Sequence, residues 1–328
     1  MNTNAEVTLQ TIEEAARTLA GHAIRTPVET CETLDLLAGR KLFFKCENFQ
    51  KSGAFKFRGA FNAVSRLVRS NEPTQRELHV VGDSSGNYAC GLALAARLCG
   101  VSAHVVMPNN APECKKQIVL SYGATLIQRE RRQDFPQTIK QVQEMTGAVY
   151  ISGSQNPDVI SGQGTMGLEL LQQVPDLDAV IMPVGGGGML AGVSMAIKSI
   201  CPDVRVYGAE PEVANQATLS LQNGERFVYS YVPRSIADGV VAGIGPVTWT
   251  YIRDNVDDIF TVTEDEIKNA MRLVSERMKL VVEPSGVVGV AAALSDSFRA
   301  RAVGFKNVAV ILSGGNVDLQ KLPELLLM

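Results

Sequence analysis

The stretch from Ser52 to Ala60 surrounds Lys56 with small and apolar residues. A lysine ammonium is strongly hydrated and is rarely buried without a partner, while apolar surroundings lower its pKa. A lysine must lose its proton before it can attack an aldehyde and form a Schiff base. The pattern therefore indicates a Schiff-base lysine, although a lysine beside Phe55 is more often only a solvated side chain.

Four consecutive glycines, Gly185 to Gly188, separate an apolar run expected as a strand at 179–182 from a helical run at 189–197. In such a strand–loop–helix unit, free backbone N–H groups point at an anion beside the helix N-terminus. Glycine loses much conformational freedom on folding, so four in a row indicate close backbone approach. The loop matches neither G-x-G-x-x-G nor the P-loop pattern. A lone phosphate fits it better than a dinucleotide or a nucleoside triphosphate.

Two further polar segments follow expected strands. The Ser-Ser-Gly-Asn loop at 84–87 lies between a strand at 78–81 and a helix at 88–98, and Ser313 follows an apolar strand at 308–312. Hydroxyls and amides at a helix start are ordinary caps, but they also suit a carboxylate and a phenolic oxygen. Open α/β folds bind their ligands at the carboxyl ends of such strands.

The elements that must position these residues alternate along the chain between strands and helices, which predicts βαβ units and a parallel sheet. An amphipathic helix is expected from Lys56 through Leu67, and another helix at 161–173. We predict a small inserted domain at 78–152 and a large domain formed by 1–77 plus 153–328. A cleft between two such domains would exclude water when it closes on a substrate.

Together these segments resemble the fold-type II pyridoxal-phosphate enzymes, and among them the serine racemase and serine/threonine dehydratase branch. The resemblance runs along nearly the whole chain. It implies an α/β fold of the tryptophan synthase β-like kind, with two three-layer αβα domains and mostly parallel sheets. Its further motifs are K-C-E-N-F-Q-K at 45–51, S-G-Q-G-T at 161–165, A-E-P at 209–211, I-A-D-G-V at 236–240, D-D-I-F-T-V-T-E-D-E-I-K at 257–268 and V-E-P-S-G at 282–286.

The resemblance also implies a role for each matching residue. Lys56 would hold pyridoxal 5'-phosphate as a Schiff base and move protons on one face of the substrate, and Ser85 would be the acid/base on the opposite face. The implied cofactor contacts are Phe55 under the ring, Asn87 at the ring hydroxyl oxygen, Gly185, Gly186, Gly187, Gly188 and the Met189 N–H at the phosphate, and Ser313 at the pyridine nitrogen. The implied substrate contacts are Ser84, Ser85, Gly86, Asn87 and Ser154.

The neutral hydroxyl of Ser313 has a consequence for the reaction. A carboxylate would keep the pyridine nitrogen protonated and make the ring a deep electron sink, which a hydroxyl does not do. The α-carbanion must then be consumed quickly, by loss of a β-leaving group or by reprotonation. We therefore predict a dehydratase that converts a β-hydroxy amino acid (serine, threonine, 3-hydroxyaspartate or phenylserine class) to a 2-oxo acid and ammonia. Serine racemisation with side elimination is the alternative, because both reactions share the carbanion.

Two other functions are weighed against this interpretation. A β-replacement synthase usually carries a threonine-containing phosphate loop, and the tetraglycine loop disfavours it. A non-catalytic homologue would be expected to lose Lys56 or Ser313, and both are present.

The chain departs from the racemase pattern around the expected substrate. Tyr88 and Cys90 stand where the branch often has His and Gln, and Ser154, Ala242 and Phe135 fall where serine racemases carry polar or charged residues. Loss of a charge and a hydroxyl predicts a less polar β-substituent, as in threonine or a bulkier β-hydroxy amino acid.

A divalent cation is a further expectation from the resemblance. Relatives bind Mg²⁺ or Ca²⁺ (Mn²⁺ being a third option) near the position of Glu210. The matching ligands here are the Glu210 carboxylate, the Ala214 carbonyl and Gln216, which replaces a second acid. Hard cations prefer charged oxygen ligands, so this site would be weaker than that of the relatives.

Composition bounds the remaining function classes. The chain has 328 residues, 45% of them hydrophobic and 20% charged, which is ordinary for a globular protein. A net charge of −3 gives no basic surface for nucleic acid. No apolar run is long enough to span a bilayer, and the polar start at 1–6 lacks a signal-peptide core. We expect a cytoplasmic enzyme acting on a small amino acid, with no nucleic acid or membrane partner, and a homodimer by resemblance.

Overall fold

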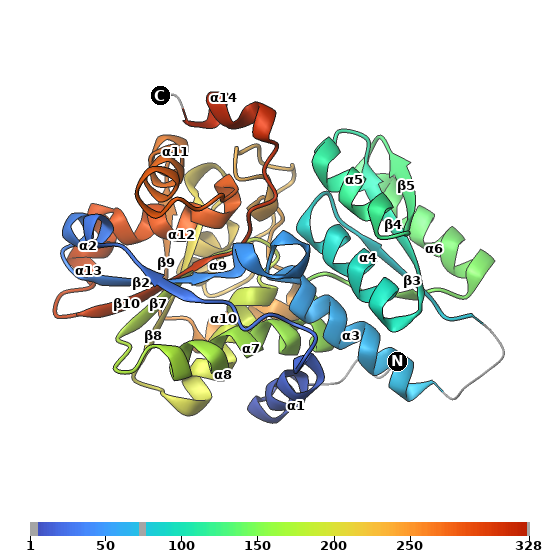
Figure 1. Ribbon diagram of the computed structural model, residues 1–328, viewed down its shortest axis with the longest axis horizontal. Helices are drawn as coiled ribbons and strands as arrows, with labels where there is room; N and C mark the ends of the chain where they lie inside the picture. Colours follow the sequence, from blue (N-terminus) through green and yellow to red (C-terminus); the bar gives the residue numbers. More distant parts are fainter. Residues whose placement is uncertain (1–5, 72–76, 327–328) are drawn as a thin grey trace.

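Two β-sheets organise the computed structural model, which describes residues 6–71 and 77–326 (Figure 1). The larger sheet has six strands in the order β1-β2-β10-β7-β8-β9, all parallel except β1, which is antiparallel to β2. Its strands are β1 (Val28–Thr30), β2 (Lys41–Cys46), β7 (Ala179–Pro183), β8 (Arg205–Pro211), β9 (Asp258–Val262) and β10 (Asn307–Leu312).

Helices cover both faces of the larger sheet, because alternate residues of each strand point to opposite sides. Phe44 and Val310 pack on one face against α2 (Glu32–Ala38), α11 (Glu264–Leu273), α12 (Pro284–Leu294) and α13 (Asp296–Arg301). Val180 and Ala309 pack on the other face against α1 (Leu9–Leu19), α7 (Pro157–Gln173), α8 (Gly188–Ile200) and α10 (Pro246–Asn255). The central strands β7 and β10 are apolar on both faces, as expected of a buried parallel sheet.

The smaller sheet has four parallel strands in the order β5-β4-β3-β6. They are β3 (His79–Asp83), β4 (Ser102–Pro108), β5 (Thr125–Arg129) and β6 (Val149–Tyr150). On one face Val80 and Val105 belong to a core with α4 (Asn87–Cys99) and α5 (Glu113–Ser121), and on the other Val81 and Val106 pack on α6 (Phe135–Thr146). This gives a second three-layer unit, as the resemblance implied.

Helix α3 (Lys56–Ser70) precedes this segment in sequence but shares its core. Phe57 and Phe61 belong to the same apolar cluster as Tyr88 and Leu92 of α4. In Figure 1 this helix runs between the two sheets. The strands of the smaller sheet all fall within the predicted insert at 78–152, whose boundaries as a domain stay a prediction.

The predicted helices and strands are present, with shifted ends. Helix α7 begins at Pro157 instead of 161, because the Asn156 side chain accepts from the N–H groups of Asp158 and Val159. Proline is favoured at the first helical position, where its missing N–H costs nothing. The S-G-Q-G-T motif therefore lies inside a helix and not at its start.

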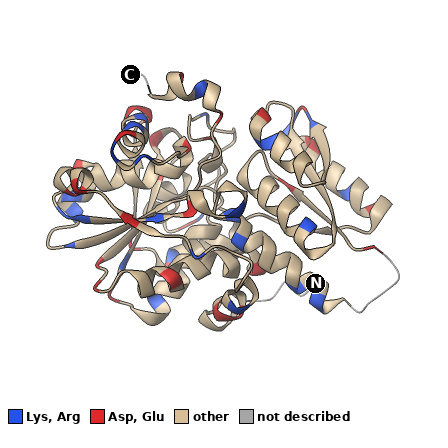
Figure 2. Cartoon of the chain, in the orientation of Figure 1, with Lys and Arg blue, Asp and Glu red and all other residues tan. Residues whose placement is uncertain are grey.

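Charges of both signs are spread over the helices of both units (Figure 2). Within residues 6–71 and 77–326, no helix combines the length and the apolarity needed to cross a membrane. The polar start at 1–6 lies almost wholly outside the described residues.

Candidate active site

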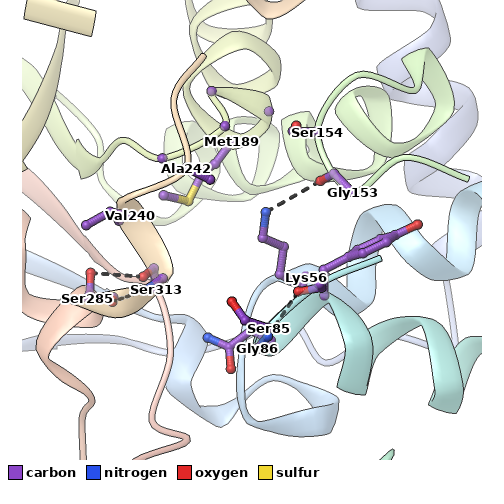
Figure 3. Close-up of a pocket in the computed structure, with 18 of the residues that line it drawn as sticks. Lys56, Ser85, Gly86, Gly153, Ser154, Met189, Val240, Ala242, Ser285 and Ser313 are labelled. Carbon is purple, nitrogen blue, oxygen red and sulfur yellow. Dashed lines mark hydrogen bonds between the residues drawn. The ribbon is translucent and has the colours of Figure 1, made fainter. Parts of the chain in front are cut away.

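One cavity lies at the carboxyl ends of strands from both sheets (Figure 3). It opens where β3, β7 and β10 end. All the residues predicted to contact cofactor or substrate line it: Phe55, Lys56, Ser84, Ser85, Gly86, Asn87, Ser154, Gly185, Gly186, Gly187, Gly188, Met189 and Ser313. The fold therefore brings together segments that are more than two hundred residues apart in sequence.

Lys56 is the first residue of α3, and its side chain extends into this cavity (Figure 3). Its Nζ donates to the Gly153 carbonyl oxygen at 3.4 Å and lies 4.8 Å from the centre of the Phe55 ring. Burial lowers the pKa of Lys56 to about 8, and no nearby charge offsets that shift. The lysine is therefore neutral far more often at physiological pH than an exposed one, as a Schiff-base lysine requires.

Glycines hold the backbone of Lys56 where it is. A Cβ atom on Gly59 would lie 2.5 Å from the Val159 carbonyl oxygen of α7. A Cβ atom on Gly91 of α4 would lie 3.1 Å from the carbonyl carbon of Lys56. The first turn of α3 is thus packed backbone to backbone against two other helices.

The tetraglycine loop joins β7 to α8, and two side chains donate hydrogen bonds to the carbonyl oxygen of Gly186 in this loop. The Gly186 oxygen accepts from Gln155 Nε2 at 3.3 Å and from Thr248 Oγ1 at 3.0 Å. Gly187 has φ +83°, a left-handed conformation that favours glycine, and a Cβ on Gly186 would lie 2.6 Å from Ser154 Oγ. Gly185 to Gly188 line the cavity just before and at the start of α8 without side chains of their own, which suits a phosphate at this helix N-terminus.

Two further side chains of the cavity lining match the remaining predicted cofactor contacts. Ser313 directly follows β10, is 5% exposed and donates to the Ser285 carbonyl oxygen at 3.5 Å. The Asn87 amide donates to the carboxylate of Glu283, and its oxygen accepts from Asn316 at 2.9 Å. A low-pKa amine, an open phosphate cradle and a neutral hydroxyl in one cavity fit pyridoxal phosphate. When bound, that group would stabilise negative charge at the substrate α-carbon.

Ser85 enters the cavity from the loop between β3 and α4. The loop is folded on itself, since the Gly86 N–H donates to Ser84 Oγ at 3.0 Å. Figure 3 shows Ser85 and Lys56 pointing into the same space from different elements. Ser85 Oγ accepts from Arg132 Nη2 at 3.0 Å, a contact that the sequence analysis did not foresee.

Several polar residues of the cavity were missed by the sequence analysis. Asp83 ends β3, so the rule that ligands bind at strand ends could have found it. Arg132 stands in a charged Glu-Arg-Arg run typical of a solvated loop, and no pattern distinguishes it. The other polar side chains of the lining that were not assigned are Tyr150, Ser152, Asp238 and Ser285.

The sequence analysis expected a substrate with a less polar β-substituent, in part because Phe135 was placed near the substrate. The structure does not support that placement. Phe135 lies outside the cavity, buried in the core of α6 with Ile139 and Val142. Arg132, three residues earlier, does line the cavity and adds a positive charge to it. Ser154 and Ala242 do line the cavity, as expected.

The residues predicted to bind a metal do not form a cation site in this arrangement. Both oxygens of Glu210 accept from the start of α9 (Gln216–Asn223), namely from the N–H groups of Ala217 and Thr218 and from Thr218 Oγ1, at 2.9–3.0 Å. The Gln216 amide donates to the Phe227 carbonyl. Burial raises the pKa of Glu210 to about 7. No group of three or more His, Cys, Asp or Glu suited to a metal occurs in the described part of the chain.

The comparisons with known proteins agree with this geometry. Serine racemase of Homo sapiens is 50% identical over 295 residues, which are 90% of this chain and 86% of the relative. L-threo-3-hydroxyaspartate ammonia-lyase of a Pseudomonas species is 44% identical over 317 residues, 95% of this chain and 96% of the relative. The solved structure of maize serine racemase superposes with a TM-score of 0.92 at 42% identity, covering 98% of this chain and 97% of the other.

The family model described as pyridoxal-phosphate dependent enzyme matches residues 19–314, nearly the whole chain. The match includes Lys56, the tetraglycine loop and Ser313, so the cavity and the family model concern the same residues. The chain therefore belongs to the pyridoxal-phosphate dependent enzymes of fold type II, in the branch that contains the serine racemases and the serine/threonine dehydratases.

Proposed function

We propose that this protein is an amino acid racemase whose substrates include serine, with elimination from β-hydroxy amino acids as a second activity. The relatives support this order, the reverse of the one expected from the sequence. Serine racemases are among the relatives with the highest identity, whereas the ammonia-lyase relative is less similar.

The observation that carries the proposal is the pair of proton-transfer groups in one cavity. Lys56 and Ser85 reach it from different elements, α3 and the loop before α4. Racemisation needs one group to remove the α-proton and a second group to deliver a proton to the other face. The Lys56 amine, with its pKa lowered to about 8, suits the first step, and the Ser85 hydroxyl suits the second.

Elimination requires one proton-transfer group of the protein, whereas racemisation requires two. The proton that Lys56 takes from the α-carbon can be returned to the β-hydroxyl, which leaves as water. No acid on the opposite face takes part, so Ser85 is dispensable for elimination. The two activities therefore differ in one residue, which makes them separable by mutation.

The test is a paired assay of the purified holoenzyme with L-serine, recording D-serine and pyruvate together. We expect D-serine in excess for the natural protein. Ser85→Ala is expected to lower D-serine formation about 100-fold or more while pyruvate formation stays within about tenfold. Ser199→Ala, an exposed position on α8, serves as the matched control and leaves both rates unchanged. An equal fall of both rates in Ser85→Ala, or pyruvate without D-serine in the natural protein, would reject the racemase proposal.

The homodimeric state and the cytoplasmic location remain predictions. Light scattering during size-exclusion chromatography tests the first, and fractionation of the source cells tests the second.

A further inference from the structure

Arg132 brings a positive charge into the cavity beside the candidate acid/base. It opens the short 3-10 turn between β5 and α6, at 132–134, and lines the same cavity as Lys56. Its Nη2 donates to Ser85 Oγ at 3.0 Å. Both Arg131 and Arg132 are exposed residues. The neighbouring Arg131 differs, because it pairs with Asp134 at 3.5 Å and does not line the cavity.

Among the charged side chains that line the cavity, Arg132 is the one whose charge is available to bind a ligand. Lys56 is committed to the cofactor. The carboxylate of Asp83 accepts from the Tyr150 hydroxyl at 2.8 Å, and that of Asp238 lies 3.4 Å from Lys115 Nζ. In contrast, no carboxylate of residues 6–71 or 77–326 lies within 4.0 Å of the Arg132 guanidinium. A guanidinium has five N–H donors, and Ser85 accepts only one of them.

The position of Arg132 suits a second carboxylate of the substrate. The loop at 84–87, at the start of α4, is the predicted site of the α-carboxylate, and Ser85 belongs to it. A group that contacts Ser85 from outside the loop is within reach of the atoms beyond the α-carbon. A planar guanidinium binds a carboxylate through two parallel hydrogen bonds, whereas the single hydroxyl of serine or threonine leaves its charge uncompensated.

We propose that Arg132 selects a dicarboxylic amino acid, so that the preferred substrates are of the aspartate and 3-hydroxyaspartate class. This inference rests on the proposed function, because it names the substrate of the same site. It also explains why an arginine lies beside the candidate acid/base: with such a substrate, Arg132 would bind the distal carboxylate and keep the Ser85 side of the α-carbon open for proton transfer.

The test measures binding without turnover. 2-Methylaspartate and 2-methylserine lack the α-proton, so neither can be racemised or lose its β-substituent by α-proton removal. Isothermal titration of the holoenzyme is expected to give a dissociation constant for 2-methylaspartate that is at least about tenfold lower than the one for 2-methylserine. Arg132→Ala is expected to abolish that preference, and Arg132→Lys to restore only part of it, since an ammonium keeps the charge but not the fork.

Arg131→Ala is the matched control and leaves both dissociation constants unchanged. An equal loss of both ligands in Arg132→Ala would assign the arginine to the α-carboxylate and overturn the inference. Natural holoenzyme that shows no preference for 2-methylaspartate, including binding of neither ligand, would also overturn it. The serine assay tests the proposed function separately: D-serine formation without a dicarboxylate preference rejects only this inference, and the preference without racemisation rejects only the racemase proposal.

Discussion

Lys56 combines two properties that a surface lysine lacks. Its amine is held over an aromatic ring and near a single carbonyl oxygen, with no carboxylate to stabilise the charged form. Burial alone therefore decides its protonation, because removing an ammonium from water penalises the charged state. The neighbouring residues Phe55 and Gly153 supply that environment through their side chain and backbone, respectively.

This environment predicts the pH dependence of cofactor capture. Only the neutral amine attacks an aldehyde, so the rate at which apoprotein binds added pyridoxal phosphate is expected to rise with pH and to level off above about 8. Stopped-flow absorbance measures it. Lys56→Ala is expected to abolish the absorbance change that accompanies cofactor binding. Lys51→Ala is expected to leave the pH midpoint of the binding rate unchanged. A rate that still rises tenfold per pH unit between 9 and 10 would show an ordinary lysine pKa.

At the scale of elements, the site depends on how closely three helices approach each other. Helix α3 meets α7 at Gly59 and Gly162, and meets α4 at Gly91. A Cβ on Gly162 would lie 2.6 Å from the Cα of Gly59, so neither helix can carry a side chain at that point. The position of Lys56 is thus set by backbone contacts one turn or less away.

The loss of stability caused by a glycine-to-alanine substitution is therefore expected to grow as the distance between the added Cβ and its nearest neighbour falls. Gly59→Ala places a methyl group 2.5 Å from a backbone oxygen and is expected to lower the free energy of unfolding by about 1–3 kcal/mol. Gly91→Ala, where the nearest atom is 3.1 Å away, is expected to cost less. Urea titrations followed by circular dichroism measure both. The reverse order would mean that α7 moves aside more easily than the start of α3.

At the scale of the whole molecule, one buried ion pair connects the two sheet units. Lys115 of α5 lies 3.0 Å from Glu283, the residue before α12, and both side chains are 2% exposed. Asp238 lies 3.4 Å from the same ammonium, and the Asn87 amide donates to Glu283. Burial raises the pKa of Glu283 although Lys115 opposes that shift. The Lys115–Glu283 pair therefore holds α5 against the segment before α12, and the bond from Asn87 to Glu283 connects α4 to the same point.

Removing one partner is expected to cost more than removing both. Lys115→Met leaves a buried carboxylate without its counter-charge, which is expected to destabilise the protein by about 3–5 kcal/mol, and adding Glu283→Gln is expected to recover at least half. The deficit of Lys115→Met should be larger at pH 8 than at pH 5, because a carboxyl with a raised pKa costs stability only when ionised. Urea titrations at the two pH values measure it.

Lys116→Met is the matched control for that experiment. Lys116 pairs at 3.1 Å with Glu113, whose side chain is 64% exposed, and an ion pair with a solvated partner contributes little to stability. A Lys115→Met variant no less stable than Lys116→Met would show that Glu283 is neutral or solvated in the folded protein.

The sequence by itself determined the fold class, several of the strands and helices, and the segments that meet at the cavity. These signals are local: apolar runs, glycine loops and polar residues at strand ends depend on a few neighbouring residues each. The family could be recognised for the same reason, since Lys56, the tetraglycine loop and Ser313 are short, ordered motifs.

Only the tertiary structure decided which solvated-looking charges enter the site. Arg131 and Arg132 are indistinguishable in sequence, yet one pairs with a loop aspartate and the other reaches Ser85. The choice depends on the turn that follows β5 and on the strand order β5-β4-β3 of the smaller sheet, which bring together two loops that are 47 positions apart in sequence. Glu210 shows the converse: the resemblance to cation-binding relatives implied a metal ligand, but the fold surrounds its carboxylate with the N–H groups that begin α9.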